Sequence, residues 1–210
     1  MVLMFLIKVG VDKTNYEYLC VKLQQLVYCQ RNRKGVKMIE KAELKRIYNF
    51  ATSKKKTTVS KAQNRNDEKI EWVVISDLNS SQIEIGITRN GYWGIKSRDC
   101  LSLLDKESSL LYFIVLLEYP MENIKRSLIA SLEQFVEMPR LNHVFPFFEI
   151  VKFVFDHNSS TYWIELAFEW YDQFTFQEKQ VLKESMDKLI INYSVSQKTR
   201  QKAKRELTKL

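Results

Sequence analysis

Three carboxylates in the aromatic segment 162–174 have a spacing that suits acid–base or metal chemistry. Glu165, Glu169 and Asp172 stand at positions i, i+4 and i+7, so a helix would place them on one face. Carboxylates arranged in this way can bind a divalent metal or act as a general acid and base. The same spacing is typical of a solvated helix face, and no neighbouring histidine supports a metal nuclease. We therefore favour a solvated or ion-paired face, which is also able to receive one of the protein's own basic ends.

The two histidines offer little further chemistry. His143 and His157 are fourteen residues apart, and neither has ligand spacing to a cysteine or to the other histidine. His157 precedes Ser159 and Ser160, which would suit a base and a nucleophile, but neighbours on a short loop rarely point at one another as a triad requires. We interpret this segment as a surface loop with a helix cap, and we predict no metal site and no catalytic residue.

Nucleotide-binding motifs are also missing from the sequence. Neither GxxxxGK[ST] nor GxGxxG occurs, and Gly86, Gly91 and Gly94 lie in a predicted hairpin region where none of them opens a helix. We expect no cofactor, and an NTP-dependent enzyme is disfavoured.

Lysine and arginine give the broadest chemical signal. Basic segments can neutralise phosphates and release counterions, while Tyr92 and Trp93 offer ring faces beside cations. The candidate nucleic-acid-binding residues are Arg31, Arg33, Lys34, Lys54, Lys55, Lys56, Lys61, Arg65, Tyr92, Trp93, Lys198, Arg200, Lys202, Lys204 and Arg205. The alternative is an ordinary solvated surface, since the helix dipole alone favours cations in a last helical turn.

The net charge of +8 over 210 residues is segregated along the chain. Residues 1–70 hold 16 Lys and Arg against 6 Asp and Glu, and residues 71–193 hold 11 against 18. Residues 194–210 hold 6 against 1. Two basic ends therefore bracket an acidic and aromatic middle, a pattern that favours an anionic partner.

Cysteine content and apolar runs predict the compartment. Three cysteines are an odd number, and Cys20 and Cys29 would lie on different faces of one helix, so we expect buried or free thiols in an intracellular, cytoplasmic protein. The apolar start 1–7 lacks a basic n-region and a cleavage site. The longest apolar run, 110–117, is far shorter than the roughly 20 residues of a membrane span, so we expect no membrane insertion.

The first half of the chain predicts helices as well as strands. Residues 1–9 are apolar and predict a strand, and a helix is expected after Thr14 and Glu17, which have capping-box spacing. A second, shorter helix is predicted by four apolar residues on one face: Leu44, Ile47, Tyr48 and Ala51. Pairing of 26–30 with 36–39 as a hairpin is the alternative, but the periodicity favours helices.

A small sheet is expected next. Residues 52–69 are polar and cationic without apolar periodicity, so we predict an exposed loop. Strand signals follow in 72–75, in the alternating isoleucines of 83–87 and in 92–93, after the Asn90-Gly91 dipeptide of a type I′ turn. They predict a three-stranded antiparallel meander. Two helices and a hairpin also suggest a winged helix, although the basic loop interrupts that pattern.

The rest of the chain has a helical period. Three apolar stripes predict three helices: Met121, Ile124, Leu128, Leu132 and Phe135; Leu141, Val144, Phe148, Val151 and Phe155; and Leu182, Met186, Leu189, Ile190 and Tyr193. Residues 162–174 are apolar on nearly every side and predict a central buried helix. Thr175 with Glu178, and Ser194 with Gln197, have the spacing of capping boxes.

These patterns predict an α+β fold. Residues 1–98 would form a basic mixed unit of two helices and a small antiparallel sheet with a hairpin, carrying the exposed cationic loop 52–69. Residues 99–210 would form an all-α helical bundle ending in a basic helix 194–210. A faint self-similarity at an offset of 39 residues makes short HEAT-like helix pairs the alternative to a plain bundle.

We expect a non-enzymatic binding protein that holds RNA or single-stranded DNA through its basic loop and tail. The first alternative is a protein–protein interaction module, such as an adaptor, an immunity protein or a complex subunit, that binds no nucleic acid. The remote alternative is a small hydrolase or nuclease centred on Glu165, Glu169, Asp172 and His157. The sequence leaves the ligand and the oligomeric state open.

Overall fold

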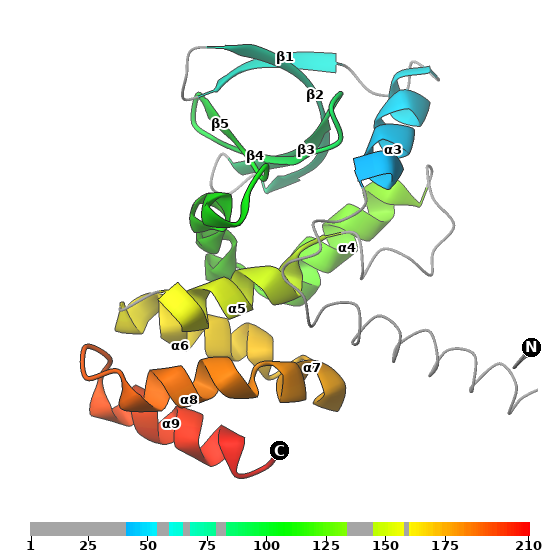
Figure 1. Ribbon diagram of the computed structural model, residues 1–210. Coiled ribbons are helices and arrows are strands. Elements are labelled where there is room, and N and C mark those ends of the chain that lie inside the picture. The colour runs from blue at the N-terminus through cyan, green and yellow to red at the C-terminus, as the bar shows by residue number, and fades with distance from the viewer. Residues whose placement is uncertain (1–40, 54–58, 65–67, 79–82, 134–144, 158–159) are drawn as a thin grey trace, which may run out of the picture. The chain divides into compact units, whose positions relative to one another are not determined.

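Five strands close into a barrel (Figure 1). They are β1 (Val59–Asn64), β2 (Lys69–Leu78), β3 (Ile83–Thr88), β4 (Trp93–Ser97) and β5 (Cys100–Leu103). Each strand is antiparallel to the next, and β5 pairs with β1 in parallel. Parallel closure follows because a meander with an odd number of strands leaves its first and last strands pointing the same way. The predicted small antiparallel sheet with a hairpin is therefore wrong, and the fold combines helices with a closed barrel.

The computed structural model describes residues 41–53, 59–64, 68–78, 83–133, 145–157 and 160–210. The predicted strand 1–9 and the helix expected after Thr14 lie outside these residues, as do Phe135, Leu141 and Val144 of the apolar stripes.

Barrel closure depends on two strands that the sequence pattern does not reveal. β1 lies inside the predicted loop 52–69, and of its residues only Ala62 is buried, so its sequence looks like that of a polar loop. β5 lies inside the segment predicted to be helical from Asp99 onward. The exposed cationic loop is thus partly a strand, and the helical part begins after Leu103.

The barrel interior is filled by one tryptophan ring. Trp72 is fully buried and packs with Ala62 and Leu101, with Ile70, Val74 and Leu103 partly buried around them. Gly86 and Gly94 face each other across β3 and β4. The Trp72 ring occupies the space that a side chain at Gly86 would need, and Leu101 lies closest to the position of a side chain at Gly94. A small closed barrel has room for few interior side chains, so a large ring requires small neighbours.

The β3–β4 turn differs from the predicted type I′ turn. Thr88 N donates to Tyr92 O at 2.9 Å, and Gly91 N donates to Thr88 O at 2.9 Å. Gly91 is in the left-handed region with φ +76°, while Asn90 is not. This is a three-residue loop in which glycine occupies the left-handed position, the next most common hairpin arrangement.

Two helices pack beside the strands. α3 (Lys41–Ser53) contacts β2 and β3 and buries the four predicted residues Leu44, Ile47, Tyr48 and Ala51. α4 (Met121–Leu132) lies against β2, where Ser76 Oγ and Ser127 Oγ are 2.7 Å apart. α4 buries Met121, Ile124, Leu128 and Leu132, so the described part of the first C-terminal stripe is confirmed.

The remaining elements are helical. They are the 3-10 helices η3 (Glu107–Tyr112) and η4 (Ile114–Glu118), followed by α5 (Phe147–His157), α6 (Thr161–Tyr171), α7 (Phe176–Val181), α8 (Lys183–Ile191) and α9 (Gln197–Leu207). α6 is buried on one face rather than nearly all round. In the third stripe Leu182, Met186 and Leu189 are buried, but Tyr193 is 88% exposed, which corrects its placement in the core.

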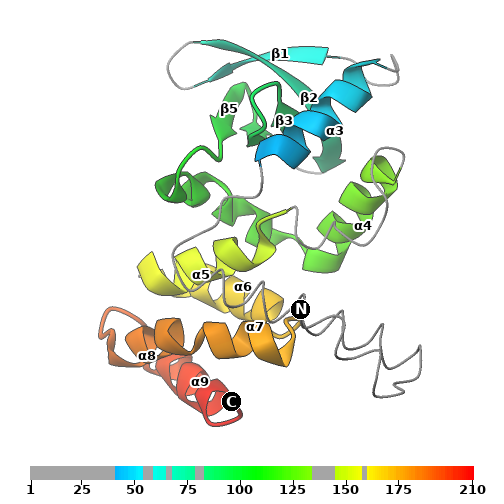
Figure 2. The same ribbon diagram turned by 45° about the vertical axis from the view of Figure 1, so that its right-hand side comes forward.

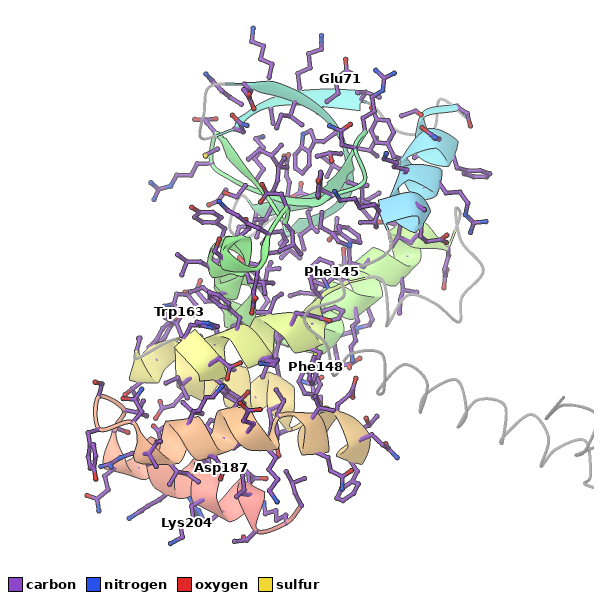
Figure 3. The ribbon with its side chains drawn as sticks, in the orientation of Figure 1. Glu71, Phe145, Phe148, Trp163, Asp187 and Lys204 are labelled. Carbon is purple, nitrogen blue, oxygen red and sulfur yellow. The ribbon has the colours of Figure 1, made fainter. Side chains whose placement is uncertain are left out.

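A chain of aromatic rings joins the barrel to the helices. Trp93 on β4 lies edge-on to Phe145 with ring centroids 5.1 Å apart, and Phe145 lies 4.8 Å from Phe147 at the start of α5. Phe147 lies 5.5 Å from Trp170 of α6, whose Nε1 donates to the Tyr119 carbonyl at 2.9 Å. Figure 3 shows Phe145 between the barrel and α5. Barrel and helices therefore share one hydrophobic core.

We predict that Gly86→Ala destabilises the barrel much more than Gly94→Ala does. A Cβ at Gly86 would lie 2.3 Å from the Val73 carbonyl oxygen and 2.6 Å from the Trp72 ring, and neither can move without disturbing the strands. At Gly94 the nearest atom, 2.9 Å away, ends the flexible Leu101 side chain. Urea unfolding followed by circular dichroism should show losses of about 3 kcal/mol and about 1 kcal/mol, respectively. Equal losses would contradict the packing described for the barrel interior.

Candidate nucleic-acid interface

The structure describes eight of the fifteen candidate residues: Lys61, Tyr92, Trp93, Lys198, Arg200, Lys202, Lys204 and Arg205. The other seven lie outside the described residues: Arg31, Arg33, Lys34, Lys54, Lys55, Lys56 and Arg65. Of the described eight, three belong to the barrel and five to α9, so the candidates form two separate groups.

The barrel group does not offer the aromatic surface that the sequence suggests. Trp93 is 1% exposed and belongs to the ring chain of the core, so its prediction as a stacking residue for bases is wrong. Tyr92 is half-buried, and its hydroxyl accepts a hydrogen bond from the Lys41 ammonium, which also lies 4.1 Å from the ring centroid. Lys96 forms an ion pair with Glu84 at 3.1 Å. Lys61 alone among the barrel candidates is an exposed cation.

α9 begins at a cap different from the predicted one. Ser196 is the N-cap, and its Oγ accepts from Thr199 N at 3.2 Å, so the predicted pair of Ser194 and Gln197 is wrong. Thr199 and Ala203 form the buried face, which packs against α8 and α6. Figures 1 and 2 both show α8 and α9 side by side. Leu207 is partly buried against the same core, and the exposed residues of α9 are Gln197, Lys198, Gln201, Lys204 and Arg205.

One flank of α9 contacts the acidic helix α6. Lys202 Nζ lies 4.0 Å from Asp172 Oδ2 and 4.6 Å from the Phe168 ring centroid. Glu165 and Glu169 are exposed on α6, as a solvated face predicts. Lys202 of the C-terminal segment thus contacts the acidic middle of the chain.

The outward face of α9, which consists of Lys198, Gln201, Lys204, Arg205 and Thr208, is exposed throughout. Gln201, Lys204, Arg205 and Thr208 line a shallow surface hollow. Figure 3 shows Lys204 on the outer side of α9. Lys198, Lys204 and Arg205 form no ion pair within the described residues, whereas Lys202 and Lys209 each lie beside a carboxylate. The outward face therefore holds three cations without a counter-charge there.

Helix stability explains only part of this arrangement. Lys204 and Arg205 lie in the last turn, where the helix dipole favours cations by about 0.3–1 kcal/mol each. Lys198 lies in the first turn, which contains no acidic residue, and there the dipole opposes a cation. An external anion on the outward face would offset that repulsion.

A buried carboxylate joins α8, the partner of α9, to α5. Asp156 pairs with Lys152 on its own helix and lies 3.4 Å from Lys188 Nζ on α8. Burial by itself would raise the pKa of Asp156, but hydrogen bonds from Lys152 and Ser185 and the charges of the two lysines together lower it. The folded state therefore favours the ionised carboxylate.

Among the described residues, no arrangement of side chains supports the alternative of a small hydrolase or nuclease. His157 stacks on Phe153 at 4.7 Å between ring centroids, and its Nδ1 lies 3.2 Å from the Phe153 carbonyl oxygen. No three His, Cys, Asp or Glu side chains of the described residues converge as metal ligands. Over the same residues, no helix has the length and apolarity needed to cross a membrane.

No family model, curated protein or solved structure matches this chain.

We predict that Asp156→Asn destabilises the protein at neutral pH. Because the folded pKa lies below the ordinary value of 3.8, the stabilisation is present above pH 3.8 and is lost as the pH falls through the folded pKa. Urea unfolding at pH 7 should show a loss of about 1–2 kcal/mol that shrinks as the pH falls below 3.8.

Asp187→Asn is the matched control for this substitution, because Asp187 is exposed on α8 and forms no ion pair within the described residues. It should change the free energy of unfolding by less than about 0.5 kcal/mol. A loss for Asp156→Asn that stays constant from pH 7 to pH 2.5 would contradict the electrostatic role of Asp156.

Proposed function

We propose that the protein is a non-enzymatic nucleic-acid-binding protein that contacts phosphates through the outward face of α9. The observation that carries the proposal is the row of exposed Lys198, Lys204 and Arg205 without ion pairs in the described residues. Arginine and lysine neutralise phosphates and release counterions on binding. Gln201 and Thr208, which lie between and beside them, add hydrogen-bonding groups suited to phosphate or sugar oxygens.

The spacing of these cations suits an extended anion. Lys198 and Arg205 are seven residues apart, which corresponds to about 10 Å along a helix axis. A single small anion would not span that distance, whereas a polymer of phosphates can meet each cation with a different group. A polyanion therefore uses the whole face, while a metabolite would use only part of it.

The buried face of α9 argues against a lipid surface as the partner. A helix that lies on a membrane needs a free apolar face, but the small apolar face of α9 is occupied by α6 and α8. The outward face contains no large apolar side chain among Lys198, Gln201, Lys204, Arg205 and Thr208. A hydrated, flexible polyanion is the partner class that this surface fits.

We predict that replacing Lys198, Lys204 and Arg205 together by glutamine weakens binding to nucleic acid and reduces its salt dependence. Fluorescence anisotropy with labelled oligonucleotides across a salt series measures both quantities. The slope of log K against log salt should fall by about 2, since each lost phosphate contact removes about 0.7 for a single strand. Thermal unfolding of the variant should remain close to that of the unchanged protein, because all three side chains are exposed.

The matched control replaces Lys45, Lys106 and Arg126 by glutamine. These residues are exposed on α3, before η3 and on α4, so the control loses the same net charge at other places. The proposal requires the control to bind nearly as the unchanged protein does. Equal behaviour of the two triple variants would mean that binding reports net charge alone, and the proposed α9 interface would be wrong.

A further inference from the structure

The tip of the α8–α9 hairpin presents a tyrosine ring to solvent. Tyr193 is 88% exposed, more than any other large hydrophobic or aromatic side chain of the described residues. The backbone on both sides is fixed: Ser194 N donates to Asn192 Oδ1 at 3.0 Å, Val195 N donates to Asn192 O at 3.1 Å, and Val195 is buried. The first of these bonds closes an Asx-type turn, in which the asparagine side chain binds the backbone two residues further on. The exposed ring thus stands on an ordered turn.

Arginine lies over this ring. The Arg200 guanidinium carbon is 5.1 Å from the Tyr193 ring centroid, and the Nε of Arg200 is buried without an acceptor among the described residues. A cation over a tyrosine face is attracted by the ring quadrupole by about 0.5–1 kcal/mol at exposed sites. Arg200 can cover one face only, and the high exposed fraction of Tyr193 leaves ring surface open to a ligand.

The ring and the phosphate-binding face lie on adjoining parts of one helix hairpin. At 100° per residue, Arg200 and Lys202 lie on opposite flanks of α9, with the outward cations between them. Lys202 adjoins the carboxylate of Asp172, whereas Arg200 adjoins Tyr193. An anionic chain on the outward face therefore has the Asp172 carboxylate on one side and the Tyr193 ring with Arg200 on the other.

We propose that Tyr193 is a stacking platform for an unpaired nucleobase, so that the protein's partner is single-stranded nucleic acid. This inference rests on the proposed function of α9. Every base has a face that can stack on an aromatic ring, and arginine adds a cation–π contribution. Inside a duplex, away from its ends, both faces of each base are covered by the neighbouring base pairs, so an unpaired base reaches Tyr193 far more readily. A nucleic-acid strand whose phosphates lie on the outward face and whose base turns toward Tyr193 stays away from the flank of α9 that adjoins Asp172.

Two substitutions at Tyr193 test the platform. Tyr193→Leu keeps an apolar side chain but removes the ring, and Tyr193→Phe keeps the ring without the hydroxyl. We expect Tyr193→Leu to weaken binding to single-stranded oligonucleotides by about 5- to 150-fold, which converts the 1–3 kcal/mol of base–aromatic stacking. Tyr193→Phe should restore binding to within about twofold. The salt dependence of Tyr193→Leu should match that of the unchanged protein, because no phosphate contact is lost.

Tyr162→Leu is the matched control. Tyr162 is also an exposed tyrosine, at 54%, but it donates a hydrogen bond to Glu118 at 3.0 Å instead of lying under an arginine. Its replacement should leave the affinity for single strands unchanged. A closed circular duplex, which has no terminal base pair, is the second control, and its affinity should be the same for Tyr193→Leu and the unchanged protein.

The outcomes separate this inference from the proposed function. Unchanged single-strand binding by Tyr193→Leu, together with weakened binding by the α9 triple variant, would overturn the stacking platform and support the α9 interface. Equal losses for single strands and the circular duplex in Tyr193→Leu would overturn the platform as well, because loss of a base-stacking ring cannot weaken binding to a duplex without ends. Unchanged binding in both Tyr193→Leu and the triple variant would overturn both proposals.

Discussion

The aromatic contacts between β4, Phe145 and α5 are the constraint on which the rest of the described structure depends. The strands of a small closed barrel turn one set of side chains inward, and Trp72 already fills that interior. The outward side chains of β4 therefore need a second layer, and Phe145 with Phe147 supplies it. Because Trp170 continues the ring chain, α6 is placed by the same contacts. Aromatic pairs contribute about 0.5–1.5 kcal/mol each beyond their buried area, so this connection is both strong and directional.

The placement of α9 is an indirect consequence of that core. The aromatic contacts position α5 and α6. The ion pair of Asp156 on α5 with Lys188 on α8 joins these two helices. α9 then packs on α8 and α6. Only the small residues Thr199 and Ala203 are buried in α9, so its five cations occupy other positions without disturbing the packing. Separation of a rigid aromatic core from a hydrophilic outer helix lets the protein present charge at little cost in stability.

Local periodicity predicted the helices well, because each buries one face against a neighbour. The buried residues of α3 and α4 are those of the apolar stripes, and the capping box of Thr175 with Glu178 is present. The barrel was not predicted, since β1 buries only Ala62 and its closure with β5 joins residues far apart in the sequence. A polar strand that has lost its alternation cannot be distinguished from a loop by pattern alone.

The candidate site was predicted in part, for a related reason. A cationic helix is visible in composition, so the α9 residues were found. The expected positions of two aromatic residues were wrong. Trp93, expected to offer a ring face, is buried, and Tyr193, which extends an apolar stripe by one step, is exposed. The signal for the second case lies in Asn192, because an asparagine at that place ends α8 and turns the next residue out of the stripe.

Parallel closure of the barrel also joins strands that lie far apart in the sequence. Among the described residues the seam between β1 and β5 pairs Gln63 with Cys100 and Asn64 with Leu101, and each pair joins positions 37 residues apart. Such a pairing forms late in folding, since the loop must close before its contacts form. Local opening should therefore begin at the seam, where the half-buried thiol of Cys100 becomes accessible to alkylating reagents before the rest of the barrel unfolds.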